Sequence, residues 1–126
     1  MSTIKVGTLL AADGSTTTQP SIPALDQRMA KAWVHFNGTG TVAINGAYNV
    51  SSITDSGTGS YIMNFTNNLA NANFTAAGFS GRNANSIIAG TFNARSVSSL
   101  AFATGNNNAA FAFVDVDSVA MTVFGL

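Results

Sequence analysis

The sequence predicts an all-β fold: an antiparallel β-sandwich or jelly-roll-like domain of about 8–9 short strands, preceded by an extended N-terminal arm. Three observations lead to this prediction. Apolar residues alternate with polar ones over short runs, which is the period of a half-buried strand. Clusters of Gly, Asn and Ser separate these runs at the spacing of turns. Strong helix formers other than Ala are scarce, because the chain has no Glu and two Lys.

The arm is predicted at residues 1–29, before the sandwich domain at residues 30–126. Residues 3–10 predict one short strand, residues 11–22 have the composition of turns and linkers, and residues 23–30 predict about two helical turns with Pro at their start. The arm carries apolar side chains without a core of its own. We therefore expect it to dock on a neighbouring subunit through Ile4, Val6, Leu9 and Leu10.

The strand pattern begins at residue 31. In residues 31–37, Ala32, Val34 and Phe36 share one face, and Trp33 and His35 lie on the other. A turn at residues 38–40 leads to a strand at 41–44. Asn45-Gly46 predicts a type I′ hairpin turn into a strand at 48–54. The next hairpin has a five-residue loop at 55–59 and a second strand at 60–66.

Further strands are predicted over the second half of the chain, with turns at 81–85 and 105–108: 73–79, 86–92, 97–103, 109–116 and 118–124. The last two carry apolar residues on both faces. A sandwich with one core leaves its outer faces in water and alternates more cleanly. We therefore expect these faces to be covered by other copies of the chain.

Charge content excludes some partners. The chain has five Lys and Arg, five Asp and a formal net charge of zero. Five scattered cations cannot form the basic surface that nucleic acid requires, and no run of apolar residues is long enough to span a membrane. We expect no nucleic-acid partner and no membrane insertion. So few charges also make an unusual surface for a free monomer, which again favours self-association.

Three segments together resemble a known module: KAWVHFNGTGTVAI at 31–44, NVSSITDSGTGSY at 49–61 and NFT at 64–66. They are similar to a domain of tailed-bacteriophage structural proteins, found in fibre-like and other virion proteins of phages of aquatic bacteria, cyanophages especially. The similarity is close over about residues 28–66. His35 stands where the pattern usually has Asn, Asn45 where a basic residue is frequent, and Ser60 where Asp is frequent.

This resemblance implies a non-enzymatic, β-rich virion component that self-assembles, as a homotrimer. We expect a short fibre, a spike or a capsid decoration protein on the exterior of the phage particle, made in the host cytoplasm and bound to other virion proteins. The alternative is a carbohydrate-binding, lectin-like module that attaches to a host-surface glycan. Its candidate contacts are Trp33, His35 and the polar run Asn106, Asn107 and Asn108.

No catalytic, cofactor or metal residues are assigned from the sequence. A hydrolytic triad needs a His beside a nucleophile and an acid, and the one His of the chain, His35, lies in mid-strand. Asp115 and Asp117 have the spacing of two carboxylates on one strand face, which suits a hard cation or glycosidic cleavage, but also a loop anchor. Trp33 with Tyr61 suggests either a sugar-stacking platform or packing in a core or interface.

Overall fold

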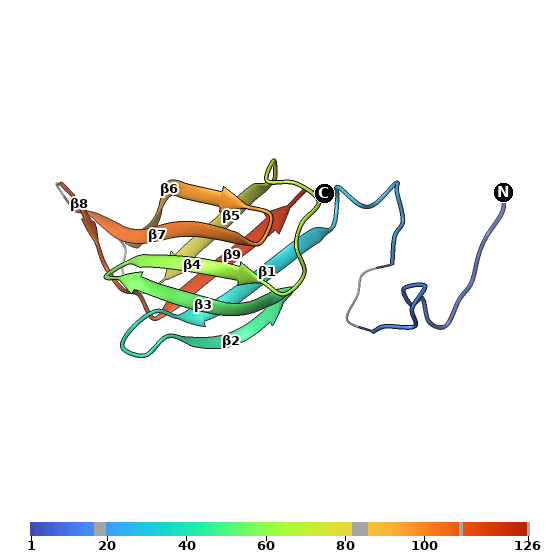
Figure 1. Cartoon of the computed structure of the whole chain (residues 1–126), viewed down its shortest axis with the longest axis horizontal. Coiled ribbons are helices and arrows are strands. Elements are labelled where there is room, and N and C mark those ends of the chain that lie inside the picture. Colours follow the sequence, from blue (N-terminus) through green and yellow to red (C-terminus); the bar gives the residue numbers. More distant parts are fainter. Residues whose placement is uncertain (17–19, 82–85, 109, 126) are drawn as a thin grey trace.

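Two antiparallel sheets pack on one another in the computed structural model, and the N-terminal segment runs away from one end of them (Figure 1). The structure describes residues 1–16, 20–81, 86–108 and 110–125. Its strands, in chain order, are β1 (Ala30–Asn37), β2 (Ala43–Tyr48), β3 (Val50–Gly57), β4 (Ser60–Phe65), β5 (Thr75–Gly81), β6 (Ser86–Ser96), β7 (Ser99–Asn108), β8 (Ala110–Phe113) and β9 (Ser118–Phe124).

Sheet A has the strand order β2-β1-β9-β5, and sheet B has the order β3-β4-β7-β6, with β8 paired to the second half of β7. Every pairing is antiparallel. The described residues contain no helix, and thus no helix that could cross a bilayer. The predicted all-β sandwich is confirmed.

The core lies between the sheets and follows the predicted alternation. In β1 the side chains of Ala32, Val34 and Phe36 are buried. The other core strands contribute Tyr61, Met63, Phe65, Leu100, Phe102, Val119, Met121 and Val123. Phe36 meets the ring of Tyr61 edge-on, with ring centroids 5.1 Å apart. Burial of each large apolar side chain stabilises the fold by about 1.5–3 kcal/mol.

The expected hairpin turn at Asn45-Gly46 is wrong. His35 pairs with Gly46 and Phe36 pairs with Ile44, so Asn45 is an extra residue within β2. Such an extra residue is a β-bulge, which bends the strand without ending it. The chain instead turns at Asn49, between β2 in sheet A and β3 in sheet B. Asn-Gly favours a hairpin only when the two flanking strands pair, and here they belong to different sheets.

Asn49 holds this crossing between the sheets. Its φ of 54° lies in the left-handed region, which Asn tolerates better than most residues. Its side-chain amide donates to the carbonyl oxygens of Lys31, at 3.0 Å, and Asn67, at 3.2 Å. Its side-chain oxygen accepts from the Asn67 backbone N–H at 2.8 Å. These three hydrogen bonds offset the strained backbone and join the start of β1 to the segment after β4.

Other boundaries differ from the prediction. The hairpin after residue 54 is confirmed, but β3 continues to Gly57, so the connection to β4 is shorter than the expected loop. The expected turn at residues 105–108 is wrong, because β7 continues through these residues and pairs with β6 and β8. The strand expected at 109–116 is shorter, since β8 ends at Phe113. Residues 82–85 of the expected turn lie outside the described residues.

Two expectations for the arm are also wrong. Residues 3–10 form no strand, and residues 23–28 form turns instead of a helix. The backbone N–H groups of Asp26 and Met29 do donate helix-like hydrogen bonds, to the carbonyl oxygens of Ile22 and Leu25 at 3.0 and 3.1 Å. A strand needs a neighbour for its backbone hydrogen bonds, and none of the described strands pairs with the described part of the arm.

Candidate functional site

Among the side chains that the structure describes, two of the three exposed aromatic ones lie on the outer face of sheet A. Trp33 is 41% exposed and Phe79 is 81% exposed. The strand register places Trp33 opposite Tyr48, and Phe79 two strands away from His35 across Ala120. We call this surface the aromatic face; it consists of Trp33, His35, Tyr48, Phe79 and Phe124. It contains no acidic residue.

Gly46 gives Trp33 its position on this face. A Cβ atom added at Gly46 would lie 3.4 Å from Cζ3 of Trp33, so the indole ring lies directly over the glycine. Because Gly46 has no side chain, the ring can lie close to the backbone of the sheet. The two residues of the Asn-Gly pair therefore have different roles. Asn45 forms the bulge, and Gly46 leaves space for the Trp33 ring.

His35 has a polar neighbour that sequence spacing does not reveal. Its Nε2 lies 3.1 Å from Oγ of Ser118 on β9. The His35 side chain is exposed on the surface of sheet A. Ser118 is a diagonal cross-strand neighbour of His35, since His35 pairs with Ala120. Only a strand register, which the sequence did not provide, could have identified this pair.

Trp33 and Tyr61 are not brought together. Trp33 faces outward from sheet A, whereas Tyr61 of sheet B is fully buried between the sheets. The expected platform of these two rings is therefore wrong, and the alternative of core packing holds for Tyr61. Successive side chains of a strand point to opposite faces of a sheet. Trp33 lies on the outer face of sheet A, and Tyr61 lies on the inner face of sheet B.

Tyr61 and Asp115 form a polar cluster at one end of the sandwich. The Tyr61 hydroxyl donates to Oδ1 of Asp115 at 2.9 Å and lies 3.1 Å from the Gly38 carbonyl oxygen. The same Oδ1 accepts from the Gly59 N–H at 2.6 Å. A Cβ atom at Gly38 would collide with the Tyr61 hydroxyl, so glycine is required there.

Thr104 completes this cluster. Its hydroxyl donates to the Val114 carbonyl at 2.6 Å, and its N–H donates to the Gly59 carbonyl at 2.7 Å. Asp115 thus anchors the β3–β4 turn to the segment between β8 and β9, which is the loop-anchor alternative for this residue. Residues 114–116 lie outside the strands, so Asp115 and Asp117 are not two carboxylates on one strand face. Within the described residues, no group of three or more His, Cys, Asp or Glu is placed to hold a metal.

Stability should fall at alkaline pH because of Tyr61. Burial, followed by the hydrogen bond to Asp115 and its charge, raises the pKa of Tyr61 above the usual value of about 10. The neutral hydroxyl therefore stabilises the fold fully below about pH 10, and this contribution is lost as the pH rises further. Urea unfolding at about pH 8 and about pH 11 should show a smaller loss in Tyr61→Phe than in the wild type. Tyr48→Phe, the matched control, should lose as much unfolding free energy between the two pH values as the wild type does. The same loss in all three proteins would contradict the prediction.

The candidate contact residues occupy different parts of the molecule. Trp33 and His35 share the outer face of sheet A, whereas Asn106 lies on β7 in sheet B, opposite Ser86 and Ala112. The side chains of Asn107 and Asn108 lie outside the described residues. The structure therefore brings together two of the five residues. Asn106 is a strand residue, where the sequence suggested a loop tip.

The four docking residues of the arm are all exposed, with Ile4 at 87%, Val6 at 64%, Leu9 at 59% and Leu10 at 42%. Leu9 and Leu10 line one side of a shallow pocket of about 590 Å³ that the arm forms with its own residues near Pro20 and Ile22. None of the four belongs to the core of the sandwich.

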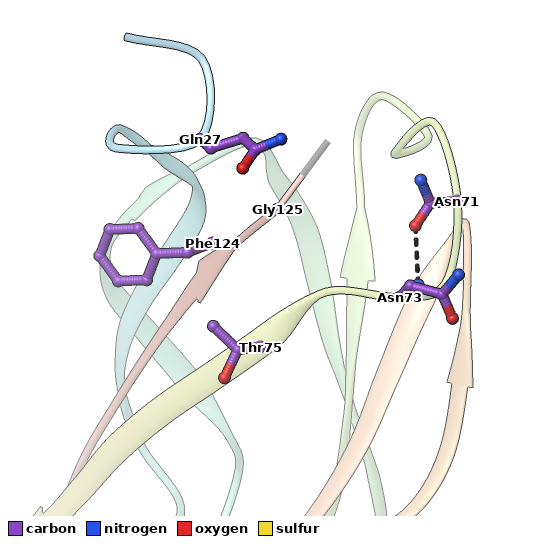
Figure 2. Close-up of a pocket in the computed structure, with 6 residues that line it drawn as sticks. All are labelled: Gln27, Asn71, Asn73, Thr75, Phe124 and Gly125. Atoms are coloured by element: carbon purple, nitrogen blue, oxygen red, sulfur yellow. Dashed lines mark hydrogen bonds between the residues drawn. The ribbon is translucent and has the colours of Figure 1, made fainter.

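A second pocket, of about 480 Å³, lies where the arm meets sheet A, and no sequence motif predicted it. Figure 2 shows its lining: Gln27, Asn71, Asn73, Thr75, Phe124 and Gly125. The Asn73 N–H donates to the Asn71 side-chain oxygen at 2.8 Å. The Phe124 ring points away from these two Asn side chains (Figure 2). The lining is uncharged and dominated by amides, which suits a neutral hydroxylated ligand more than an ion.

Comparison with known proteins gave no match: no family model, no curated protein and no solved structure is similar to this chain.

Proposed function

We propose that this chain is a non-enzymatic structural protein of a phage virion, which self-assembles as a trimer into an exterior element such as a short fibre, a spike or a capsid decoration protein. The phage assignment derives from the resemblance over residues 31–66. The assembly assignment is supported by the structure of the arm. Other virion proteins are the further partners that this proposal implies.

The unburied arm is the observation that carries the self-assembly proposal. The chain exposes 7591 Å², whereas a compact monomer of this mass exposes about 6,300 Å². The excess exposed area is on the order of 1,000 Å². The arm contributes to this area, because its apolar side chains such as Ile4 and Val6 are exposed to water. A stable interface buries about 800 Å² on each partner, so the excess is large enough for one.

The residues that carry the resemblance serve the fold. Asn37 accepts from the N–H and hydroxyl of Thr39 in the turn after β1, at 2.8 and 2.7 Å. Asn49 holds the crossing between sheets, and Gly59 and Tyr61 belong to the polar cluster. These residues shape a scaffold and do not converge on one exposed cavity. This supports a structural role for the segments that carry the resemblance.

Light scattering of the purified full chain tests the proposal. We expect a mass of three times 12.9 kDa at micromolar concentration, because burial of the arm and the aromatic face compensates for the lost freedom of the separate copies. A monodisperse species of 12.9 kDa at all concentrations would contradict self-assembly.

Carbohydrate binding is the second candidate function, and the aromatic face favours it. Trp33 presents a partly exposed indole on a flat sheet, and aromatic rings pack against the apolar faces of sugars. The amide-lined pocket near Gln27 adds neutral hydrogen-bonding groups. Glycan-array binding that Trp33→Ala abolishes would favour this function, and an array without signal would count against it.

A further inference from the structure

β5 is an edge strand of sheet A, and within the described residues it pairs with β9 alone. It pairs with β9 over seven consecutive residues without a register break, from Thr75 opposite Phe124 to Gly81 opposite Ser118. Its sequence, TAAGFSG, contains no charged residue and no proline. Natural sheets protect edge strands with charges, proline or bulges, since an unprotected edge pairs readily with another chain.

The other sheet edges of the described strands are short or irregular. β8 is an edge of only four residues, Ala110–Phe113, and short edge strands offer little to an incoming chain. The pairing of β2 has a bulge between His35 and Phe36 of its partner, and the pairing of β3 has two register breaks. The pairing of β6 has one between Ala89 and Ala94. Irregularities of this kind bend an edge away from a straight incoming strand. The β5 edge is therefore the best template for an added strand.

Phe79 marks the same edge. Its side chain lies on the outer face of β5 and is 81% exposed, more than any other aromatic side chain that the structure describes in the sandwich. A strand added beside β5 would place alternate side chains next to this ring. Pairs of an aromatic and a β-branched side chain across strands stabilise sheets, so an occupant with β-branched residues at alternate positions fits this edge.

The arm has this pattern. Residues 3–10 read TIKVGTLL, with the β-branched Ile4 and Val6 on one side of an extended chain and Lys5 on the other. Among the strands that the structure describes, they pair with none of their own chain. The arm joins the sandwich near the edge in question, since Gln27 lines the same pocket as Thr75 of β5. Residues 11–22, which precede the turns at 23–28, can extend to roughly 40 Å, which is enough to reach a second copy.

We propose that residues 3–10 of a second copy add as a strand to the β5 edge, with Ile4 and Val6 beside Phe79. This inference rests on the proposed self-assembly and specifies its interface. The contact joins two different surfaces, the arm of one copy and the edge of the next. Head-to-tail contacts form a closed ring when the rotation between copies closes, and the proposed trimer would be such a ring.

A pair of edge substitutions tests the interface. Phe79→Lys adds a charge to the β5 edge, and Ile44→Lys, the matched control, adds one to the β2 edge at a residue that is 40% exposed. Phe79→Lys should weaken assembly at least about tenfold in sedimentation, because a central aromatic contact is lost. Ile44→Lys should assemble like the wild type, and both variants should retain the wild-type β circular dichroism.

Cross-linking between copies identifies the occupant. The chain has no Cys, so copies with Ala77→Cys can be mixed with copies that carry a single cysteine in the arm. We expect disulfides from Ala77→Cys to Ile4→Cys or Val6→Cys, and far fewer to Lys5→Cys, which faces the opposite side.

The outcomes separate the two proposals. A wild-type chain that stays monomeric overturns self-assembly and this interface with it. A chain that assembles equally well with Phe79→Lys, and forms no arm-to-edge disulfide, overturns the interface and leaves self-assembly standing. Protection of the arm amides from hydrogen exchange in a monomer would show that the arm folds back on its own edge, which also overturns the proposal.

Discussion

Replacement of Gly59 by Ala should destabilise the sandwich by about 3 kcal/mol or more, which lowers the melting temperature by roughly 12 °C or more. Gly59 has a φ of 63°, and an added Cβ would collide with the Thr104 carbonyl oxygen and lie 2.7 Å from the Val114 backbone nitrogen. Both neighbours are backbone atoms of the polar cluster, so neither can move without breaking its hydrogen bonds.

Gly40→Ala is the matched control for this substitution. Gly40 has nearly the same backbone conformation, with a φ of 65°, but no atom lies within 4 Å of its added Cβ. Its loss should be about 1 kcal/mol, which is the cost of the left-handed backbone for Ala. Thermal and urea unfolding of both variants measure the difference. Equal losses would show that the contacts of Gly59 with Thr104 and Val114 contribute nothing.

Deletion of residues 1–22 should abolish assembly and leave the sandwich folded. The core consists of residues between Ala32 and Val123, and none of the arm side chains belongs to it. The Lys31–Asp26 ion pair, at 3.5 Å, remains in the truncated chain. Loss of the arm removes Ile4, Val6, Leu9 and Leu10, the apolar residues that we expect to bind a second copy.

Light scattering should therefore give the mass of a single truncated chain, and circular dichroism should give an unchanged β signal. In reconstituted particles, the truncated protein should be absent from the virion while the full chain is incorporated. A truncated chain that still forms trimers would place the interface on the aromatic face. Loss of the β signal would show that the arm is part of the fold.

The central strands of the sandwich could be predicted from the sequence, because burial on one face imposes a period of two. In β1, Ala32, Val34 and Phe36 alternate with Trp33 and His35, and the structure places them inside and outside as expected. β9 agrees with the prediction at both ends. Local composition was less reliable at turns, where the same Asn-Gly pair serves a hairpin or a bulge. The choice at Asn45 depends on which strands pair, and that is decided far away in the sequence.

The candidate site divides in the same way. The exposed arm and the outward direction of Trp33 and His35 follow from hydrophobic pattern and strand period, which are local properties of the chain. The His35–Ser118 pair joins residues 83 positions apart, and the Tyr61–Asp115 bond joins residues 54 apart. The sequence by itself determined the sheet class and the faces of the central strands, because water acts on each segment separately. Only the tertiary structure decided the register, the buried polar cluster and the unprotected β5 edge, because these depend on which distant segments meet.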